Sequence, residues 1–447
     1  MATRLPIPPA LWVYGPDGLI GTLHNTDPLS FSYSEEWLRK SGAEAIHPDV
    51  PLQAGTIDTP YIGAFFENLL PEGEQRTVIG LREQVSTVFG MLARIGGESA
   101  GAYTLLPEGE TPQPPIYQSL TWEQVKVLLH ADGAQSAERE AIEQAVKDMP
   151  KPRMSMSGAQ FKILLYLDEQ GVPSRPLGNA PSTHILKPDI GRPDIKTFAS
   201  SVNETIVMRA AALCRLPTAR VHYQPIAQAC LVERYDRVRQ QDGSLRRLWQ
   251  ADLCQLLGVQ SGAKYEHEGG PSFKDCYEKL SLSVQPAPDR RNLLRWLFFN
   301  LCVGNNDSHA KNLSLLATPG GLRLAPFYDM MCTRVYAGLS PQFAFDIAGE
   351  SEPGKLTQDH LVELARQLGI GTRFLQKLAV DMARQVGPNI AAAAEEIKPH
   401  LAHNERIMVE RLVFKITSIS TRLGNRFLGQ EPEPDTAPEQ GAGRPGH

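Results

Sequence analysis

The sequence predicts an α+β fold in which a mixed half is followed by a mainly helical half. Strand-like and helical patterns alternate up to about residue 236, and helical spacing dominates after it. A Pro-rich segment at 107–115 interrupts the first half and predicts a linker. With 447 residues, the chain is long enough for two or three domains with cores of their own.

The elements before the linker are short and are separated by turn residues. In order, we expect two strands within 11–23 around the turn Gly15-Pro16-Asp17-Gly18, a short helix at 33–40, a helix at 61–70 ended by Pro71, a helix at 79–95, and a strand at 101–106.

Between the linker and residue 236, Thr121 and Gln124 have the spacing of a capping box, which predicts a helix start. We expect helices at 121–129, 136–147 and 201–214, and strands at 162–167, 183–187, 223–227 and 229–235. After residue 236 we expect helices at 252–258, 272–283, 288–303, 357–368, 371–386, 388–397 and 403–423. The tail at 431–447 has no apolar face, and we expect it to be disordered.

Composition excludes several classes of protein. A hydrophobic content of 42% argues against wholesale disorder, and a net charge of −5 argues against a chain that coats nucleic acid by itself. The six cysteines form no Cys-x-x-Cys pair, so we expect reduced thiols rather than a disulfide framework or a zinc site. Prolines near the N-terminus do not fit a signal peptide, and the most apolar stretch, 296–303, is too short to span a bilayer. We therefore expect a cytoplasmic protein.

Asp307, Asn312 and Asp329 have the chemistry that phosphoryl transfer requires. One carboxylate would accept the proton of the attacking hydroxyl, while an amide oxygen and a second carboxylate would hold magnesium. The alternative is that Asp307 caps a helix and Asp329 ends a strand, because this spacing is frequent by chance. The Phe-Tyr-Asp return at 327–329 leaves the two interpretations about equal.

A phosphate-binding loop and a lysine have candidates in the first half. Residues 155–160 form a turn of small residues before a strand, where backbone N–H groups could face an anion, although an ordinary turn fits as well. Lys187 closes an apolar strand, and its alternative is a solvated strand end. Glu204 could pair with Lys187, but Ser201 and Glu204 have capping-box spacing, and we favour the cap.

The sequence gives weaker indications of a functional role for the remaining polar groups. Residues 233–236 follow an apolar strand and could form a hinge that offers backbone groups to adenine, or a plain linker. His309 could orient the loop of Asp307, but we favour a neutral structural histidine. No Gly-x-Ser-x-Gly elbow supports Ser-His-Asp hydrolysis. The basic pairs Arg290-Arg291 and Arg237/Arg239 predict solvated faces.

These motifs, in this order, resemble the HipA toxins, the serine/threonine kinases of bacterial toxin–antitoxin pairs. The similarity extends from about residue 11 to residue 423. It is carried by FFENLLP at 65–71, SMSGAQFK at 155–162, THILK at 183–187, VERYD at 232–236, DLCQ at 252–255, KYE at 264–266, DSHAKN at 307–312 and PFYD at 326–329.

The resemblance implies a two-lobed protein-kinase-like fold of the α+β class with an extra N-terminal α/β subdomain and a mainly helical C-terminal lobe. The corresponding boundaries are 1–113 for the N-terminal subdomain, 114–236 for the ATP-binding lobe with phosphate loop and hinge, 237–430 for the helical catalytic lobe, and 431–447 for the tail.

The resemblance also implies the roles of individual residues. Asp307 would be the catalytic base with His309 in the same site, Asn312 and Asp329 would bind Mg²⁺, and Ser155 would be autophosphorylated, which switches the kinase off. The residues implied to bind ATP are Ser157, Gly158, Ala159, Gln160, Lys187, Glu233, Tyr235 and Gln255. No arginine precedes Asp307, so we do not expect control by an activation segment, and Ser155 is the expected switch.

The family implies a HipB-like helix-turn-helix antitoxin as partner, with DNA contacted only through the complex and no membrane contact. The implied substrate is a serine of a protein, and glutamate–tRNA ligase is one substrate in the family. Two alternatives remain. One is a kinase for a lipid or a small molecule, which the lack of a basic amphipathic helix disfavours. The other is a non-catalytic co-repressor that acts with a DNA-binding partner.

Overall fold

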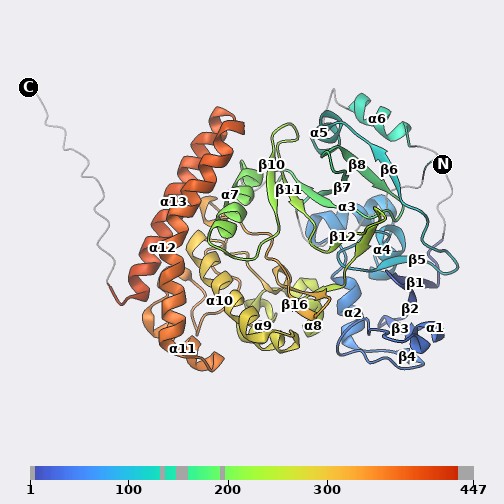
Figure 1. The fold of residues 1–447 in the computed structure, drawn as a ribbon, viewed down its shortest axis with the longest axis horizontal. Coiled ribbons are helices and arrows are strands. Elements are labelled where there is room, and N and C mark those ends of the chain that lie inside the picture. Colours follow the sequence, from blue (N-terminus) through green and yellow to red (C-terminus); the bar gives the residue numbers. More distant parts are fainter. Residues whose placement is uncertain (1–5, 131–135, 147–148, 150–159, 192–196, 431–447) are drawn as a thin grey trace, which may run out of the picture.

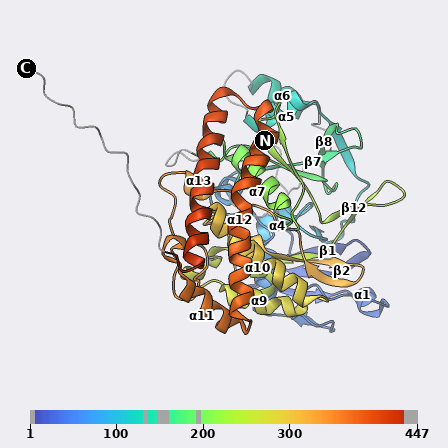
Figure 2. The same cartoon turned by 60° about the vertical axis from the view of Figure 1, so that its left-hand side comes forward.

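The computed structural model describes residues 6–130, 136–146, 149, 160–191 and 197–430. Sheets and helices are segregated, which confirms the predicted α+β class (Figure 1). The helices α12 (Thr372–Ile397) and α13 (His403–Phe427) pack side by side, on the far side of the molecule from the N-terminal strands (Figures 1 and 2). None of the described helices has both the length and the apolar content needed to cross a membrane. The six cysteines are buried free thiols.

The N-terminal part is a five-stranded antiparallel sheet with helices packed on it. Its strand order is β4-β3-β2-β1-β5. The strands are β1 (Ala10–Gly15), β2 (Gly18–His24), β3 (Ser30–Tyr33), β4 (Thr56–Ile57) and β5 (Thr104–Pro107). The helices are α1 (Glu35–Arg39), α2 (Pro60–Glu67), α3 (Gly73–Glu83) and α4 (Val88–Ile95).

Two helix predictions in this part were wrong in their bounds. The single helix expected at 79–95 is two helices, because Gln84 ends α3 in a left-handed conformation and Thr87 starts α4 by accepting a hydrogen bond from Gly90 N. Helix α2 ends at Glu67, so the three residues before Pro71 continue as turns.

The second sheet has six antiparallel strands in the order β10-β11-β9-β7-β8-β6. The strands are β6 (Ile116–Ser119), β7 (Ile163–Leu167), β8 (Pro173–Leu177), β9 (His184–Lys187), β10 (Val221–Gln224) and β11 (Ala229–Glu233). Helices α5 (Trp122–His130), α6 (Ser136–Gln144) and α7 (Ser200–Leu213) accompany it. The capping box of Thr121 and Gln124 is confirmed by its two reciprocal hydrogen bonds. Strand β8 was not predicted, because Pro173 and Pro176 obscure the strand pattern.

The C-terminal half is mainly helical, as predicted. Its helices are α8 (Leu253–Leu257), α9 (Phe273–Lys279), α10 (Pro286–Val303), α11 (Gln358–Leu368), α12 (Thr372–Ile397) and α13 (His403–Phe427). Short 3-10 helices lie at Ser261–Ala263, Glu266–Glu268, Leu280–Leu282, Ala310–Asn312, Thr333–Val335, Pro353–Lys355 and Lys398–His400. The same half also contains the hairpin of β12 (Arg237–Arg239) and β13 (Leu245–Arg247) and the small sheet of β14 (Gln250–Asp252), β15 (Ser314–Thr318) and β16 (Gly321–Leu324).

The two helices expected on either side of Pro388 are one helix, α12. Proline removes one helical hydrogen bond and usually ends or kinks a helix. Here Val386 and Ile390, on both sides of Pro388, are buried in the core, and α12 packs on α7, α10 and α13. Tertiary packing therefore outweighs the local cost of the proline.

Helix α10 is the central element of the helical lobe. Every residue from Trp296 to Val303 is buried, which is the pattern of a helix surrounded by protein on all sides. Gly304 ends the helix in a left-handed conformation (φ 69°), which turns the chain sharply into the segment that contains Asp307. The buried C-terminal end of α10 thus determines where this carboxylate lies.

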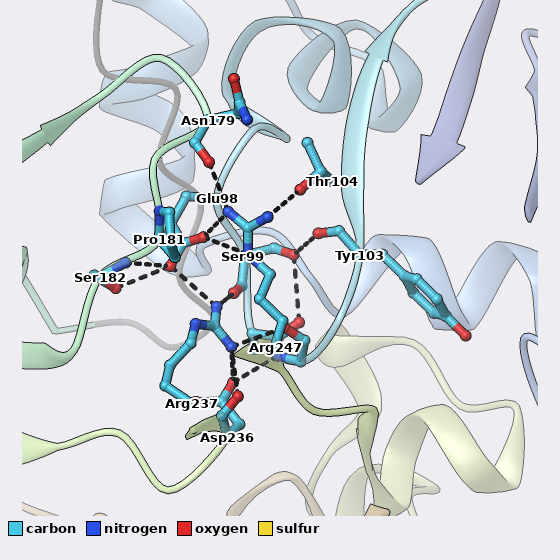
Figure 3. Close-up of polar contacts among 12 residues, drawn as sticks. Glu98, Ser99, Tyr103, Thr104, Asn179, Pro181, Ser182, Asp236, Arg237 and Arg247 are labelled. Atoms are coloured by element: carbon cyan, nitrogen blue, oxygen red, sulfur yellow. Dashed lines mark hydrogen bonds and ion pairs between the residues drawn. The ribbon is translucent and has the colours of Figure 1, made fainter. Parts of the chain in front are cut away.

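A buried network of charges joins the N-terminal sheet to the chain after β11 (Figure 3). Glu98, between α4 and β5, accepts from Arg234 at 2.9 Å, Arg237 at 3.0 Å and Arg247 at 2.6 Å. Asp236 binds Arg234 and Arg237 at 2.7 and 2.8 Å and accepts from the backbone N–H of residue 101 at 2.8 Å. The prediction of a solvated Arg237 was wrong, because its side chain is 1% exposed.

Three guanidinium groups and two carboxylates share this buried volume. Desolvation would raise the pKa of the Glu98 carboxyl, but the charges of Arg237, Arg247 and Arg234 hold this pKa well below its usual range. Glu98 is therefore ionised at neutral pH, and its removal would leave the arginines with Asp236 as the one carboxylate of the network.

We expect Glu98→Gln to lower the free energy of unfolding by about 3–5 kcal/mol, because it leaves buried guanidinium charge without its counter-ion. Chemical denaturation followed by tryptophan fluorescence measures this change. Asp17→Asn is the matched control, since Asp17 and its partner Arg246 are both more than 40% exposed, and it should cost at most about 1 kcal/mol. Equal losses in the two variants would contradict a stabilising role for the network.

Candidate active site

A cavity of about 1030 Å³ lies where the six-stranded sheet, the helical lobe and the N-terminal part meet. Its volume is in the range of small-molecule and cofactor sites. It brings together these predicted residues: Gln160, Lys187, Glu233, Tyr235, Gln255, Asp307, His309, Asn312 and Asp329. The predicted residues Ser155, Ser157, Gly158 and Ala159 lie outside the described part of the chain.

Lys187 is the buried centre of the site. Strand β9 ends on it, and its Nζ donates to Glu204 Oε1 and to Asp329 Oδ1, both at 2.6 Å. Desolvation would lower the pKa of Lys187, but Asp329 and Glu204 hold it above its usual value, so the ammonium stays charged. The alternative of a solvated strand-end lysine was wrong.

The favoured role of Glu204 as a helix cap was also wrong. Helix α7 has Ala199 at its N-cap, so Glu204 lies within the helix and faces Lys187. The hydroxyl of Ser201, the other residue of the expected capping box, donates to Asp189 Oδ1 at 2.7 Å. Capping-box spacing is local, and the buried Lys187 offered Glu204 a stronger partner than a backbone N–H.

Asp329 is aimed at Lys187 by the segment before it. Phe327 is anchored by backbone hydrogen bonds with Pro217 and Ala219 and stacks on Trp296 with ring centroids 5.9 Å apart. Asp329 itself has φ of 59°, a left-handed conformation that aspartate tolerates better than most residues. Strand β16 ends at Leu324, so Asp329 does not simply end a strand.

The charge of Asp329 is strongly favoured. Desolvation opposes ionisation, but Lys187 and then Lys162 hold the pKa of Asp329 well below its usual range. Lys162, just before β7, was given no role of its own by the sequence. Burial lowers the pKa of its ammonium, Lys187 lowers it further, and the result is about 8. The sequence feature that could have identified Lys162 is its position between Gln160 and the apolar strand.

Asp307 and Asn312 lie in the loop after α10. The carboxylate of Asp307 is 56% exposed in the cavity and accepts a hydrogen bond from the hydroxyl of Tyr265. The cavity walls displace water around Asp307 and raise the pKa of its carboxyl, an effect that Lys264 and Tyr265 partly oppose. Asp307 follows the C-terminus of α10 and is not the N-cap of the 3-10 helix after it.

The amide of Asn312 is oriented by the same loop. Its Nδ2 donates to the backbone carbonyl of Asp307 at 3.0 Å, which leaves its oxygen as the group that can bind a cation. Among the described residues, no cluster of three or more His, Cys, Asp or Glu side chains could hold a metal ion. Mg²⁺ does not require such a cluster, because it is usually bound through one or two carboxylates together with substrate phosphates and water. The donor set of Asn312 and Asp329 fits that mode.

His309 lies under the loop. Burial and then the charge of Lys264 lower the pKa of its imidazole well below the usual value, so the ring is neutral. Its Nε2 lies 3.9 Å from Asp307 Oδ1, and its buried Nδ1 has no hydrogen-bond partner among the described residues. This agrees with the favoured interpretation of a neutral histidine.

The predicted hinge and Gln255 line the cavity in different ways. Glu233 ends β11, and the ring of Tyr235 lies against that of Tyr328 with centroids 6.0 Å apart. The amide of Gln255 is bonded at both ends, since its oxygen accepts from Asp252 N and its nitrogen donates to Phe65 O, both at 2.8 Å. A contact between Gln255 and a nucleotide stays a prediction.

Family models match two parts of the chain. The model described as the HipA N-terminal domain matches residues 11–106, and the HipA-like C-terminal domain matches residues 154–393. The chain is 34% identical to "Putative kinase Y4mE" of Sinorhizobium fredii, over 85% of this chain and 90% of that protein. It is 28% identical to "Serine/threonine-protein kinase toxin HipA" of Shewanella oneidensis, over 86% of this chain and 89% of the toxin.

A solved structure has the same fold. It is the Shewanella oneidensis HipA, HipB and operator DNA complex, to which this chain is similar with a TM-score of 0.76 and 24% sequence identity. The similarity covers 94% of this chain and 98% of the other. The predicted two-lobed kinase-like architecture is thereby confirmed.

The two lysines of the site should differ in reactivity. Lys162 loses its charge as pH rises through about 8, whereas the pKa of Lys187 is raised and it stays protonated. We expect an amine-acylating reagent to modify Lys162 with a midpoint near pH 8 and to leave Lys187 unmodified there, as measured by peptide mass spectrometry. An equal reaction at both lysines would contradict the expected difference between their pKa values.

Proposed function

The chain belongs to the HipA family, and on this premise we propose that it is an ATP- and magnesium-dependent serine/threonine protein kinase that acts as the toxin of a toxin–antitoxin pair. The observation that carries the proposal is the pairing of Lys187 with Glu204 and Asp329 in the cavity that also holds Asp307 and Asn312. Two relatives named as kinases support it.

In the proposed reaction, Asp307 accepts the proton of a substrate serine hydroxyl while that oxygen attacks the γ-phosphorus of ATP. The bond between the γ-phosphorus and the bridging oxygen of ADP breaks, and the phosphoryl group passes to the serine. The raised pKa of Asp307 makes it a stronger base than an ordinary aspartate. Its exposure in the cavity leaves room for the incoming hydroxyl.

The rest of the cavity would hold the nucleotide. Lys187 and Lys162 are the cations that would face the phosphates, and the backbone of Glu233 and Tyr235 would meet the adenine. Gln160 Nε2 donates to the carbonyl of Pro188 at 2.9 Å, which ties the end of the segment 155–160 to the chain just after Lys187. Asn312 and Asp329 would hold Mg²⁺, which neutralises charge on the phosphates when bound.

Regulation and partners follow from the same premise. Ser155 would be autophosphorylated, and the added dianion beside the phosphate site would repel the nucleotide. The Shewanella oneidensis structure contains HipB and operator DNA, which supports a HipB-like antitoxin for this chain, with DNA contacted through the complex. The substrate would be a protein serine, for which a tRNA ligase is the first candidate to test.

The test is incubation of the full chain with labelled ATP and magnesium. We expect transfer of label, and we expect Asp307→Asn to lower its rate by about 10²- to 10⁴-fold because the base is lost. Asp359→Asn, an exposed position of α11, is the control and should transfer label as the unmodified chain does. If calorimetry detects no ATP binding and no label is transferred, the kinase proposal fails and the co-repressor alternative is favoured.

Mapping the labelled site tests the switch. We expect label on Ser155. We expect Ser155→Ala to lose this label while it keeps phosphorylating a protein substrate, because no phosphate group is then added beside the nucleotide site. The measurement is phosphopeptide mapping together with a substrate assay over time. Loss of all activity in Ser155→Ala would instead make the serine a required part of the site.

A further inference from the structure

A second set of polar residues lines the cavity near Asp307. Lys264 and Tyr265 line the cavity with Asp307, and the Tyr265 hydroxyl donates to Asp307 Oδ1. The neighbouring Lys264 Nζ lies 2.7 Å from Glu72 Oε2 and 5.4 Å from the centroid of the Tyr265 ring. The structure thus places the Lys264 ammonium next to the tyrosine that binds the proposed base.

The N-terminal part of the chain fixes this part of the cavity. The carboxylate of Glu67 accepts from the backbone N–H and the hydroxyl of Ser261, at 2.9 and 2.7 Å. Asn68 Nδ2 donates to the carbonyl of Val259 at 2.9 Å. The segment 67–72 therefore supports the loop on both sides of residue 261, and Glu72 at its end reaches the ammonium of Lys264.

The loop of Asp307 contains another lysine, Lys311, but that lysine is occupied. Its Nζ donates to Asn68 Oδ1 at 2.7 Å and to Asp252 Oδ2 at 3.1 Å, and its side chain is 3% exposed. Lys187 is likewise held by Glu204 and Asp329. If either lysine moved toward the oxygen of the attacking hydroxyl, it would break its two contacts.

Lys264 has a different balance of contacts. Within the described residues, Glu72 is its one carboxylate partner at ion-pair distance. The Oε1 atom of Glu72 is buried without a hydrogen bond, 3.7 Å from Lys311 Nζ. Burial has the largest effect on the pKa of the Asp307 carboxyl and raises it, and the charge of Lys264 has the next largest effect and lowers it. The ammonium thus lies within effective electrostatic reach of the position where the hydroxyl would attack.

We propose that Lys264 is a further catalytic residue, which contacts the transferring phosphoryl group, and that Glu72 of the N-terminal part positions its ammonium. The proposal rests on the proposed kinase function. Phosphoryl transfer depends on cations placed where charge lies in the transition state, because the protein contributes little covalent chemistry. Lys187 would contact the phosphates next to Asp329 and the metal. Lys264 would contact the transferring phosphoryl group next to the attacking hydroxyl.

Lys264→Met in the full chain tests this role. We expect kcat to fall by about 10²- to 10³-fold, with the Kd for ATP changed by less than about 3-fold. The Kd for ADP with magnesium and aluminium fluoride, a mimic of the transferring phosphoryl group, should rise with the loss of kcat, as calorimetry can measure without turnover. Lys264→Arg keeps the charge and should retain activity within about 10-fold.

Two further variants control for structure. Among the described residues, Lys264→Met leaves Glu72 with only its longer contact to Lys311, at 3.7 Å. The double variant Lys264→Met with Glu72→Gln removes both charges of the Lys264–Glu72 pair, and it should show the same loss. Lys274→Met, whose lysine pairs with Glu278 on the surface of α9, should behave as the unmodified chain.

The outcomes separate this inference from the proposed function. An active unmodified chain with an equally active Lys264→Met variant would overturn the role of Lys264 alone. Equal weakening of ATP and of the fluoride complex would also overturn it, because the lysine would then bind the nucleotide uniformly. An unmodified chain that neither binds ATP nor transfers phosphate would remove the kinase function and this inference with it.

Discussion

The buried ammonium of Lys187 is the constraint on which the site depends. A buried lysine is costly unless carboxylates pair with it, and here they come from 17 and 142 residues further along the chain. Strand β9, helix α7 and the segment after β16 must therefore take their places together. The anchoring of Phe327 between Trp296 and the chain at 217–219 aims Asp329 at the lysine. Through these contacts, Phe327 also joins the chain that leads into β10 of the six-stranded sheet to helix α10 of the helical lobe.

The N-terminal sheet is part of this arrangement. Glu98 binds Arg234 within the predicted hinge and Arg237 and Arg247 after it, so the N-terminal part is tied to residues 234–247. Asn68 binds Lys311 in the loop of Asp307, and Glu72 binds Lys264 in the chain after α8. These contacts involve buried charged groups, and they favour one relative position of the parts because a displaced charge would lose its partner.

Three of the wrong predictions share one cause. Glu204 had the spacing of a cap, Arg237 belonged to a short basic pair, and Pro388 should have divided a helix. Each inference weighed only near neighbours in the chain. In the fold, Lys187 binds Glu204, Glu98 binds Arg237, and packing on α7, α10 and α13 carries α12 through the proline. Distant partners outweighed local preferences of about 1–3 kcal/mol for the helix cap and for the proline.

Patterns in the sequence predicted the α+β class, most of the helices, fewer than half of the strands, and the order of the motifs that carry Asp307, Asn312, Asp329 and Lys187. These follow from side-chain periodicity and residue type, which are local properties. Which charges meet was decided by folding, which brought Lys162, Glu72 and Lys264 into the cavity although the sequence analysis had assigned none of them a role. The physical reason is that electrostatic pairing depends on distance and burial, and the folded chain sets both between residues far apart in sequence.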